Sequence, residues 1–255
     1  MKQISTLKLA RWAKAEELPV EGVCFVEDGP GLPESLAQLN VAMDAGSEAR
    51  AVELLARGAG RVLLGELALN DSTAVERLVA QYGGERVGIW VRSARSAISW
   101  SLDAEAPNAG FRCMMPSMGV AGLDVLMSDG TPTGTDAEWW IGQMLERGVS
   151  LALVSADLQD EDMNTCATLV LNHGEKLWFS TRLDPDADLE PWVRWGQVRQ
   201  LVLPTPNMRD EAEMARISAP AMVMVEEPAD TSADAEAGGA NIGLETHAGE
   251  SLRAA

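Results

Sequence analysis

Histidine is nearly absent from this sequence, since the 255 residues include only His173 and His247. His173 precedes Gly174 at the expected end of a helix, where a positive charge suits the helix dipole. His247 lies close to the end of the chain. Neither histidine supports a Ser-His-Asp or Cys-His constellation, and no HExxH motif is present. Histidine-based hydrolysis is therefore excluded as an interpretation.

Cysteine is scarce as well, and its spacing carries no motif. Cys24, Cys113 and Cys166 are odd in number, far apart, and form no CxxC pair. A disulfide framework or a zinc site is not expected, and a reducing compartment fits this usage. The chain also lacks a Walker phosphate loop and a strand-linked GxGxxG motif. We therefore expect neither a metal nor a cofactor.

Long apolar runs are missing too, and the 39 acidic residues outnumber the 20 lysines and arginines. The N-terminus has no apolar signal core, and no run of about 18 apolar residues could span a bilayer. The formal net charge is −19, which would repel a phosphate backbone. These features predict a cytoplasmic protein that binds neither nucleic acid nor membrane. The acidic residues are spread along the chain, so they indicate solubility and do not define a site.

Two patterns alternate along most of the chain and predict an α/β fold. Short apolar runs are typical of parallel strands buried on both faces. They occupy residues 3–9, 23–26, 39–43, 61–65, 86–91, 150–155, 176–181 and 198–203. Amphipathic helices are expected at 47–57, 72–82, 136–147, 160–172 and 189–195, with two turns at 33–38. Eight strands favour a closed (β/α)8 TIM barrel of the ribulose-phosphate-binding type, and an open doubly wound sheet is the alternative.

An internal echo supports this repeating unit. The segment LLARGAGRVLLGELALNDSTAVERLVAQYGGERVGI aligns without gaps to the segment 90 residues further on. Gly58 then matches Gly148, and Gly84 matches Gly174. Two copies of helix–strand–helix–strand in one register indicate stacked βα units in a right-handed parallel sheet.

Composition divides the chain into a barrel domain and a tail. Residues 1–218 are predicted to form the barrel, and 93–133, rich in Gly, Met and Pro, to form an inserted hairpin and lid after the fifth strand. A hairpin is expected at 96–102 within this insertion. Residues 219–255 combine low hydrophobicity with many acidic residues, which predicts disorder.

Reactive side chains of such barrels gather at the C-terminal ends of the strands. That rule selects Lys8, Glu27, Asp28, Asp44, Glu66, Arg92, Asp157, Arg182 and Thr205. Carboxylates at one mouth could transfer protons, while Arg92 and Arg182 could bind an anion. Polar residues that merely line a solvated rim are the alternative explanation.

Three segments carry a family resemblance. They are AMDAGSEARAVELLARGAGRVLLGELALNDSTAVERLVAQYG, ERVGIWVRSARSAISWSLD and TGTDAEWWIGQMLERGVSLALVSADLQDED. Together they resemble the histidine-biosynthesis barrel family. That family includes the phosphoribosylformimino-aminoimidazole carboxamide ribotide isomerase and the cyclase subunit of imidazole glycerol phosphate synthase. The resemblance covers about half of the chain and implies chemistry on a phosphorylated sugar.

The departures from this family concern its functional positions. The isomerase has an acid at the end of its first strand and another at the end of its fifth, where this chain offers Lys8 and the neighbourhood of Trp90. Glu66 replaces a hydroxyl residue beside Gly65, which remains from the fourth-strand phosphate loop. Ser180-Thr181-Arg182 replaces the Gly-Gly of the seventh strand. Asp157 matches the sixth-strand acid.

The candidate site therefore combines the resemblance with the strand-end rule. Asp44 and Asp157 are the candidate catalytic residues, and Gly65, Arg92 and Arg182 are the candidate ligand-binding residues.

Three readings of function remain open, and they leave both enzyme and non-enzyme roles in place. The first is a diverged isomerase-like barrel, a pseudoenzyme that has lost the ancestral reaction and acts in binding, assembly or support of a pathway. The second is an active isomerase or lyase on a phosphorylated sugar-type metabolite, in cofactor or one-carbon metabolism. The third is a structural subunit that contacts a protein partner or a second copy through the tryptophan-rich segment 189–195 or the methionine-rich segment 113–118.

Overall fold

The computed structural model describes residues 7–18, 22–96, 122–204 and 217. The predicted hairpin at 96–102 lies almost entirely outside these residues. The predicted disordered tail and Thr205 lie outside them as well.

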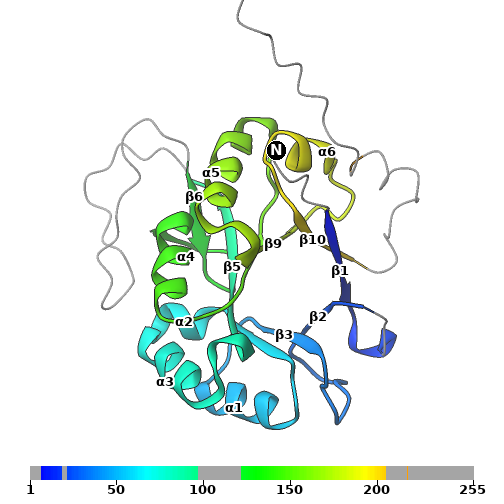
Figure 1. Ribbon diagram of the computed structural model, residues 1–255, viewed down its shortest axis with the longest axis vertical. Helices are drawn as coiled ribbons and strands as arrows, with labels where there is room; N and C mark the ends of the chain where they lie inside the picture. Colours follow the sequence, from blue (N-terminus) through cyan, green and yellow to red (C-terminus); the bar gives the residue numbers. More distant parts are fainter. Residues whose placement is uncertain (1–6, 19–21, 97–121, 205–216, 218–255) are drawn as a thin grey trace, which may run out of the picture. The chain divides into compact units, whose positions relative to one another are not determined.

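Eight parallel strands close into a barrel (Figure 1). They are β1 (Lys8–Ala13), β2 (Cys24–Glu27), β3 (Leu39–Met43), β4 (Arg61–Leu64), β5 (Val87–Arg95), β8 (Ala152–Ser155), β9 (Leu177–Ser180) and β10 (Gln200–Pro204). β1 pairs with both β2 and β10, and the pairing of β4 with β5 closes the ring. The predicted TIM barrel is therefore confirmed, and the open sheet is wrong.

Helices surround part of this barrel. They are α1 (Glu48–Ala56), α2 (Glu66–Asn70), α3 (Ser72–Tyr82), α4 (Ala137–Glu146), α5 (Met163–His173) and α6 (Glu190–Arg194), with 3-10 turns η1 (Ala15–Glu17), η2 (Gly84–Arg86), η3 (Asp160–Asp162) and η4 (Gly174–Lys176). Ser47 caps α1 as expected, because its side chain accepts a hydrogen bond from the Arg50 amide. None of the helices in the described part of the chain has the length and apolar character that a membrane crossing needs.

The helix expected at 33–38 does not form. This stretch is an irregular connection in which Leu36 is fully buried and Ala37 forms a β-bridge with Ala59. The side chain of Arg57 donates hydrogen bonds to the carbonyl groups of Leu32, Pro33 and Glu34, which holds the connection against the end of α1. Tertiary contacts thus satisfy a backbone that local propensity would place in a short helix.

The core has two layers, because alternate residues of each strand face opposite sides. A smaller cluster fills the barrel interior and includes Phe25, Leu63, Trp178 and Val202. A larger cluster lies between the strands and the helices and includes Trp140 of α4 and Trp192 of α6. Burial on both faces explains why most strands read as continuous apolar runs.

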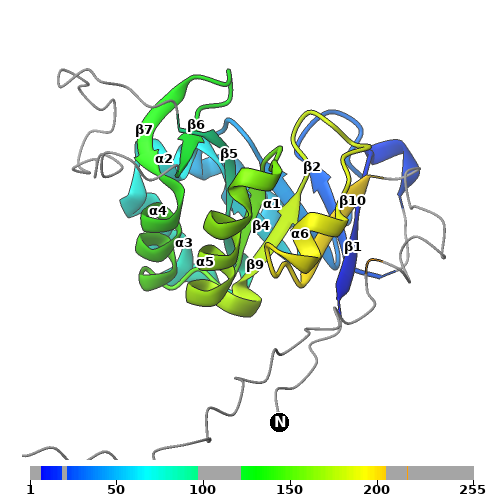
Figure 2. The same ribbon diagram turned by 90° about the horizontal axis from the view of Figure 1, so that it is seen from above.

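β5 continues beyond the barrel and carries an antiparallel extension. Ser93–Arg95 pairs with β6 (Leu123–Leu126), which pairs in turn with β7 (Pro132–Asp136). The predicted excursion after the fifth strand is therefore present, and its described part is a hairpin that projects from one end of the barrel (Figure 2). The turn at Met127–Gly130 is closed by the hydrogen bond from the Gly130 amide to the Met127 carbonyl.

The first strand differs from its prediction. It begins at Lys8 and ends at Ala13, four residues beyond the predicted end at residue 9, and residues 3–6 of the prediction lie outside the described part of the chain. Lys8 forms an ion pair with Glu175 at 3.5 Å. Ala10 and Trp12 are the residues of β1 that belong to the interior cluster. The charged Lys8 and Arg11 interrupt the apolar pattern of this strand. The sequence-based prediction therefore placed the strand too early in the chain. At the mouth, the residue that β1 contributes is Trp12 and not Lys8.

The internal echo corresponds to real repeated structure. An offset of 90 residues brings α1, β4, α3 and β5 onto α4, β8, α5 and β9. Gly58 and Gly148 follow the first helix of each copy with φ of 90° and 92°. This left-handed conformation favours glycine, which explains why both copies have it there.

One contact between the two copies is testable. A Cβ on Gly84 would overlap the carbonyl oxygen of Gly148, which is backbone and cannot rotate away. We expect Gly84→Ala to lower the free energy of unfolding by about 1–3 kcal/mol. Gly29→Ala is the control, since no atom lies within 4 Å of its added Cβ. Denaturant unfolding measures both variants, and equal stabilities would contradict the tight contact.

Candidate functional site

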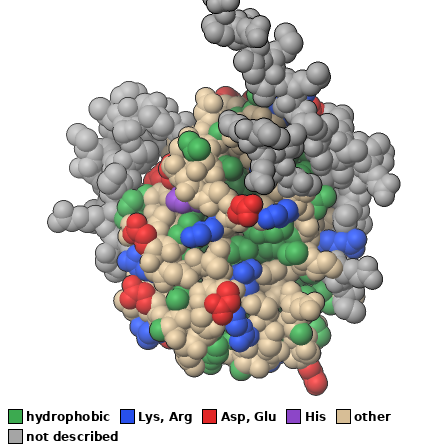
Figure 3. Space-filling view, viewed as in Figure 1, with side chains coloured by type: hydrophobic (Ala, Val, Ile, Leu, Met, Phe, Trp, Pro, Cys, Tyr) green, Lys and Arg blue, Asp and Glu red, His purple; other side chains and the backbone are tan. Residues whose placement is uncertain are grey.

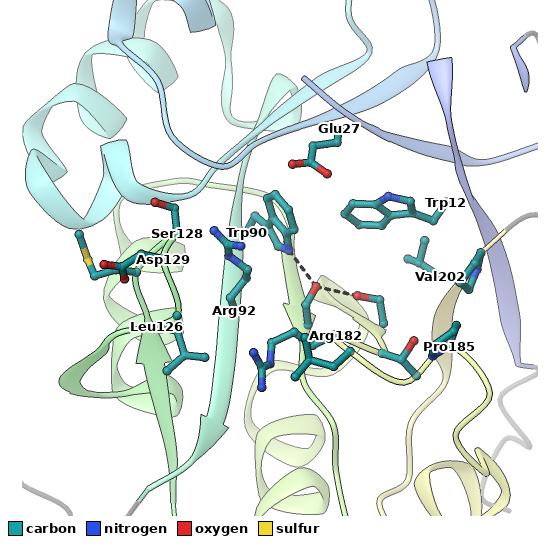
Figure 4. Close-up of a pocket in the computed structure, with 17 residues that line it drawn as sticks. Trp12, Glu27, Trp90, Arg92, Leu126, Ser128, Asp129, Arg182, Pro185 and Val202 are labelled. Atoms are coloured by element: carbon teal, nitrogen blue, oxygen red, sulfur yellow. Dashed lines mark hydrogen bonds between the residues drawn. The ribbon is translucent and has the colours of Figure 1, made fainter. Parts of the chain in front are cut away.

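A cavity of about 550 Å³ opens at the C-terminal mouth of the barrel (Figure 4). This volume suits a small molecule. Its walls come from the ends of β1, β2, β5, β8, β9 and β10, the β6–β7 turn and the loop after β9. The lining residues are Trp12, Glu27, Trp90, Arg92, Leu126, Met127, Ser128, Asp129, Gly130, Ser155, Ser180, Thr181, Arg182, Leu183, Pro185, Val202 and Pro204.

Aromatic rings form the inner part of the cavity. The rings of Trp12 and Trp90 lie 5.3 Å apart, tilted at 48°. Trp12 stacks on Phe25, whose ring lies 5.6 Å from that of Trp178 deeper in the barrel. This chain of contacts fixes two indole rings at the base of the pocket, where they offer rigid apolar surface to a flat group.

Two buried serines lie beside Trp90. The indole Nε1 of Trp90 donates a hydrogen bond of 2.8 Å to Ser155 Oγ, and Ser155 Oγ lies 2.6 Å from Ser180 Oγ. The dashed lines in Figure 4 mark these two bonds. Ser155 ends β8 and Ser180 ends β9, and these strands pair side by side with the two serines in register. Strand register therefore creates the hydroxyl pair.

Arg92 spans the mouth from β5. Its guanidinium lies 5.1 Å from the centroid of the Trp90 ring, and it forms an ion pair with Asp44 at the end of β3. Burial raises the pKa of Asp44 above its usual value, even though Arg92 opposes that shift. The positive charge of Arg92 is therefore largely committed to a protein carboxylate.

Glu27 is the carboxylate that lines the pocket from β2. Although the residue is exposed, partial desolvation raises its pKa, the nearby Asp44 charge raises it further, and Arg92 opposes the shift. No hydrogen bond from another described residue reaches this side chain. By contrast, the neighbouring Asp28 accepts two hydrogen bonds from Arg50, at 3.0 and 2.6 Å. Glu27 is thus suited to exchange a proton, whereas Asp28 ties β2 to α1.

Asp157 organises the loop after β9. Its Oδ1 accepts hydrogen bonds from the backbone amides of Arg182, Leu183 and Asp184, at 2.9, 2.8 and 3.3 Å. Its Oδ2 lies 3.5 Å from the Arg182 guanidinium. Three converging amides form a site for an anion, and the protein fills that site with its own carboxylate. Asp157 does not line the cavity.

Glu66 has a matching role at the opposite side of the mouth. Its carboxylate accepts hydrogen bonds from the Ser128 amide at 2.7 Å and from the Ser128 hydroxyl, so it holds the β6–β7 turn against α2. Gly65 lies where the ends of β3 and β4 meet, and its amide donates to the Met43 carbonyl at 2.8 Å. A Cβ at Gly65 would collide with the Asp44 carbonyl. Gly65 therefore permits a close backbone approach and lies outside the cavity lining.

The five predicted site residues separate into two groups. Arg92 and Arg182 both line the cavity, and Asp44, Asp157 and Gly65 do not. Asp44 pairs with Arg92 and Asp157 with Arg182, so the two acids lie in separate environments.

Sequence reasoning did not select Trp12, Trp90, Ser155 or Ser180 as site residues. The available signal for the serines was a hydroxyl directly after the apolar runs Ala-Leu-Val and Leu-Trp-Phe.

No group of three His, Cys, Asp or Glu side chains that could hold a metal ion occurs within the described ranges. On the face drawn in Figure 3, acidic and basic side chains are interspersed, and no patch of a single sign is evident. The charged residues that line the mouth are Arg92, Arg182, Glu27 and Asp129.

Comparisons with known proteins add little to this picture. No protein-family model matches the chain, and no curated protein matches it either. Among solved structures, a similar chain is the phosphoribosyl anthranilate isomerase from Thermococcus kodakaraensis, with 10% identity and a TM-score of 0.43. The match covers 80% of this chain and 90% of that one. We draw no conclusion about this protein from a similarity this weak, and the barrel assignment rests on the strand pairing.

The raised pKa of Glu27 predicts a pH-dependent effect on stability. A carboxyl group whose pKa is higher in the folded state lowers stability as pH rises through the interval between its unfolded and folded pKa values. We therefore expect Glu27→Gln to melt at a slightly higher temperature than the parent at pH 7, since solvent screens much of the effect at this exposed residue. The difference should shrink at about pH 4, below the usual carboxylate pKa. Thermal melting at both pH values measures this, and a lower melting temperature at pH 7 would contradict it.

Proposed function

We propose that this protein binds a small anionic metabolite at the C-terminal mouth of its barrel and does not perform phosphoribosyl isomerisation. It would act as a binding or accessory component of a pathway. The main support comes from the ends of the first and fifth strands, where the resembled isomerases have their two acids. At the mouth, β1 presents Trp12 and β5 presents Trp90, and the two indoles contact each other at 5.3 Å. Neither ring can transfer a proton as a carboxyl group does.

The loops that hold phosphates in the resembled family support the same proposal. After β9, the backbone amides bind Asp157, and after β4, Glu66 binds the β6–β7 turn. A phosphate at either loop would meet a carboxylate already in place, and like charges at close range repel. A ligand anion would instead find Arg182, whose ion pair with Asp157 is long at 3.5 Å.

A second function is favoured by one residue. Glu27 lines the cavity, its pKa is raised by burial, and a carboxyl group in this position can act as a general acid or base. With Glu27 in that role, the protein would be an active isomerase or lyase on a phosphorylated sugar-type metabolite. Asp44 would then serve Arg92 and would not exchange protons itself, because it is held in the ion pair.

Calorimetric titration and turnover assays separate these functions. Inorganic phosphate, ribose 5-phosphate and benzoate represent three classes of anion. We expect at least one to bind, and Arg182→Gln to weaken that binding about tenfold, since a charge-assisted contact is lost. Arg194→Gln is the control, because Arg194 is paired with Glu190 on α6, away from the cavity.

The full-length protein should show no turnover of the bis-phosphoribosyl substrate of the resembled isomerase. Turnover that Glu27→Gln abolishes would replace the first function by the second. Equal affinity of the Arg182→Gln and Arg194→Gln variants for the anion would show that the anion does not bind at the mouth.

A further inference from the structure

The hydroxyl pair at the base of the cavity has one proton to spare. Tryptophan Nε1 only donates, so the 2.8 Å bond from Trp90 occupies a lone pair of Ser155 Oγ. The 2.6 Å contact between Ser155 and Ser180 uses one of the two hydroxyl protons, whichever serine donates it. No acceptor for the second proton exists among the described residues. The two side chains are only 3% and 6% exposed, and both line the cavity, so a ligand atom can supply that acceptor.

Arg182 adds a positive charge to the same side of the cavity. Its ion pair with Asp157 is long, and its Nε is buried with no hydrogen-bond partner in the described structure. Arg92 differs, because it is closely paired with Asp44. Figure 4 places Arg182 on the side of Trp90 where the serine pair lies, and Glu27 on the opposite side. The positive charge of Arg182 and the spare hydroxyl proton could therefore bind the same negatively charged group of a ligand.

The donors at this position are few, which limits the kind of oxyanion. A phosphate group is usually bound by several backbone amides that converge on its oxygens. The amides of Arg182, Leu183 and Asp184 all bind Asp157. At this end of the cavity the spare hydroxyl proton and the Arg182 guanidinium remain for a ligand, and Thr181 also lines the cavity there. A hydroxyl and a guanidinium match the two oxygens of a carboxylate, and the amides of Arg182, Leu183 and Asp184 are not free to bind the further oxygens of a phosphate.

The indoles define the rest of the ligand. Trp90 binds the serine pair through its ring nitrogen, so its ring is adjacent to the proposed carboxylate position. Trp12 contacts Trp90 and extends the apolar surface across the base of the cavity. A flat ring attached to the carboxylate would stack on these indoles, and such contacts prefer offset or tilted geometry.

We infer that the ligand of the mouth is a flat-ring carboxylate, with its carboxylate held by the Ser155–Ser180 pair and Arg182 and its ring against Trp90 and Trp12. This inference rests on the proposed function and names the chemical class of its ligand. Ser180 is the specificity-determining residue, because it contacts the Ser155 hydroxyl and also lines the cavity.

Calorimetry with four probes tests the inference on the full chain. The probes are benzoate, phenyl phosphate, benzamide and ribose 5-phosphate. We expect benzoate to bind more tightly than benzamide, which lacks the charge, and more tightly than phenyl phosphate, whose further oxygens the occupied amides of Arg182, Leu183 and Asp184 cannot bind. Ser180→Ala should weaken benzoate about tenfold, as expected for the loss of a hydrogen bond to a charged group.

Two further variants keep this test interpretable. Ser180→Cys retains the side-chain volume but donates poorly, so it should resemble Ser180→Ala in binding while its melting temperature reports intact folding. Thr168→Ala removes a hydroxyl on α5 that bonds to the Asn164 carbonyl and does not line the cavity, so its benzoate affinity should equal that of the parent.

The contrary outcomes are distinct. Phenyl phosphate binding more tightly than benzoate, or unchanged benzoate binding by the folded Ser180 variants, would overturn the carboxylate assignment and leave the proposed function standing. Binding of ribose 5-phosphate without any ring probe would do the same. Failure of all four probes, together with failure of inorganic phosphate, would overturn both.

Discussion

Closure of the sheet is the constraint on which the rest of this structure depends. Pairing of β4 with β5 removes the free edges and forces alternate residues of every strand into a narrow interior. Phe25, Leu63, Trp178 and Val202 fill that interior. Closure also brings all eight strand ends to one rim, so that residues separated widely in sequence, such as Trp12 and Trp90, come into contact. The cavity exists because the interior is packed below it and the β6–β7 turn borders it.

A second theme is the use of internal carboxylates as fixed anions. Asp157 binds three amides after β9, and Glu66 binds the amide and hydroxyl of Ser128. In each case the protein satisfies its own donors at a loop, which rigidifies the rim and removes that loop as a binding site for an external anion. The mouth is left with side-chain donors, and these suggest a different ligand from a doubly phosphorylated sugar.

How far the sequence reveals these features depends on the range of the interaction. The positions of β3 and α3 were predicted to the residue, because apolar runs and helix caps are local signals. The 90-residue echo located the repeated βα units for the same reason. The first strand was misplaced because Lys8 and Arg11 interrupt its apolar pattern, and the stretch at 33–38 was misassigned because contacts of Leu36 and Arg57 override its local preference.

The residues of the candidate site also differ in whether local or long-range contacts determine their roles. Arg92 and Arg182 could be selected from the sequence, since both directly follow strand-forming runs. The true roles of Asp157 and Glu66 could not, because the amides that they bind lie 25 to 27 and 62 residues away along the chain. Nor could the Ser155–Ser180 pair, which requires the register between β8 and β9.

By itself, therefore, the sequence determined the α/β class, the barrel and the ends of strands where polar residues gather, because each depends on patterns within one or two elements. The tertiary structure alone decided which of those polar residues bind the protein and which face the cavity, because that choice depends on strand register and on partners far away in the chain.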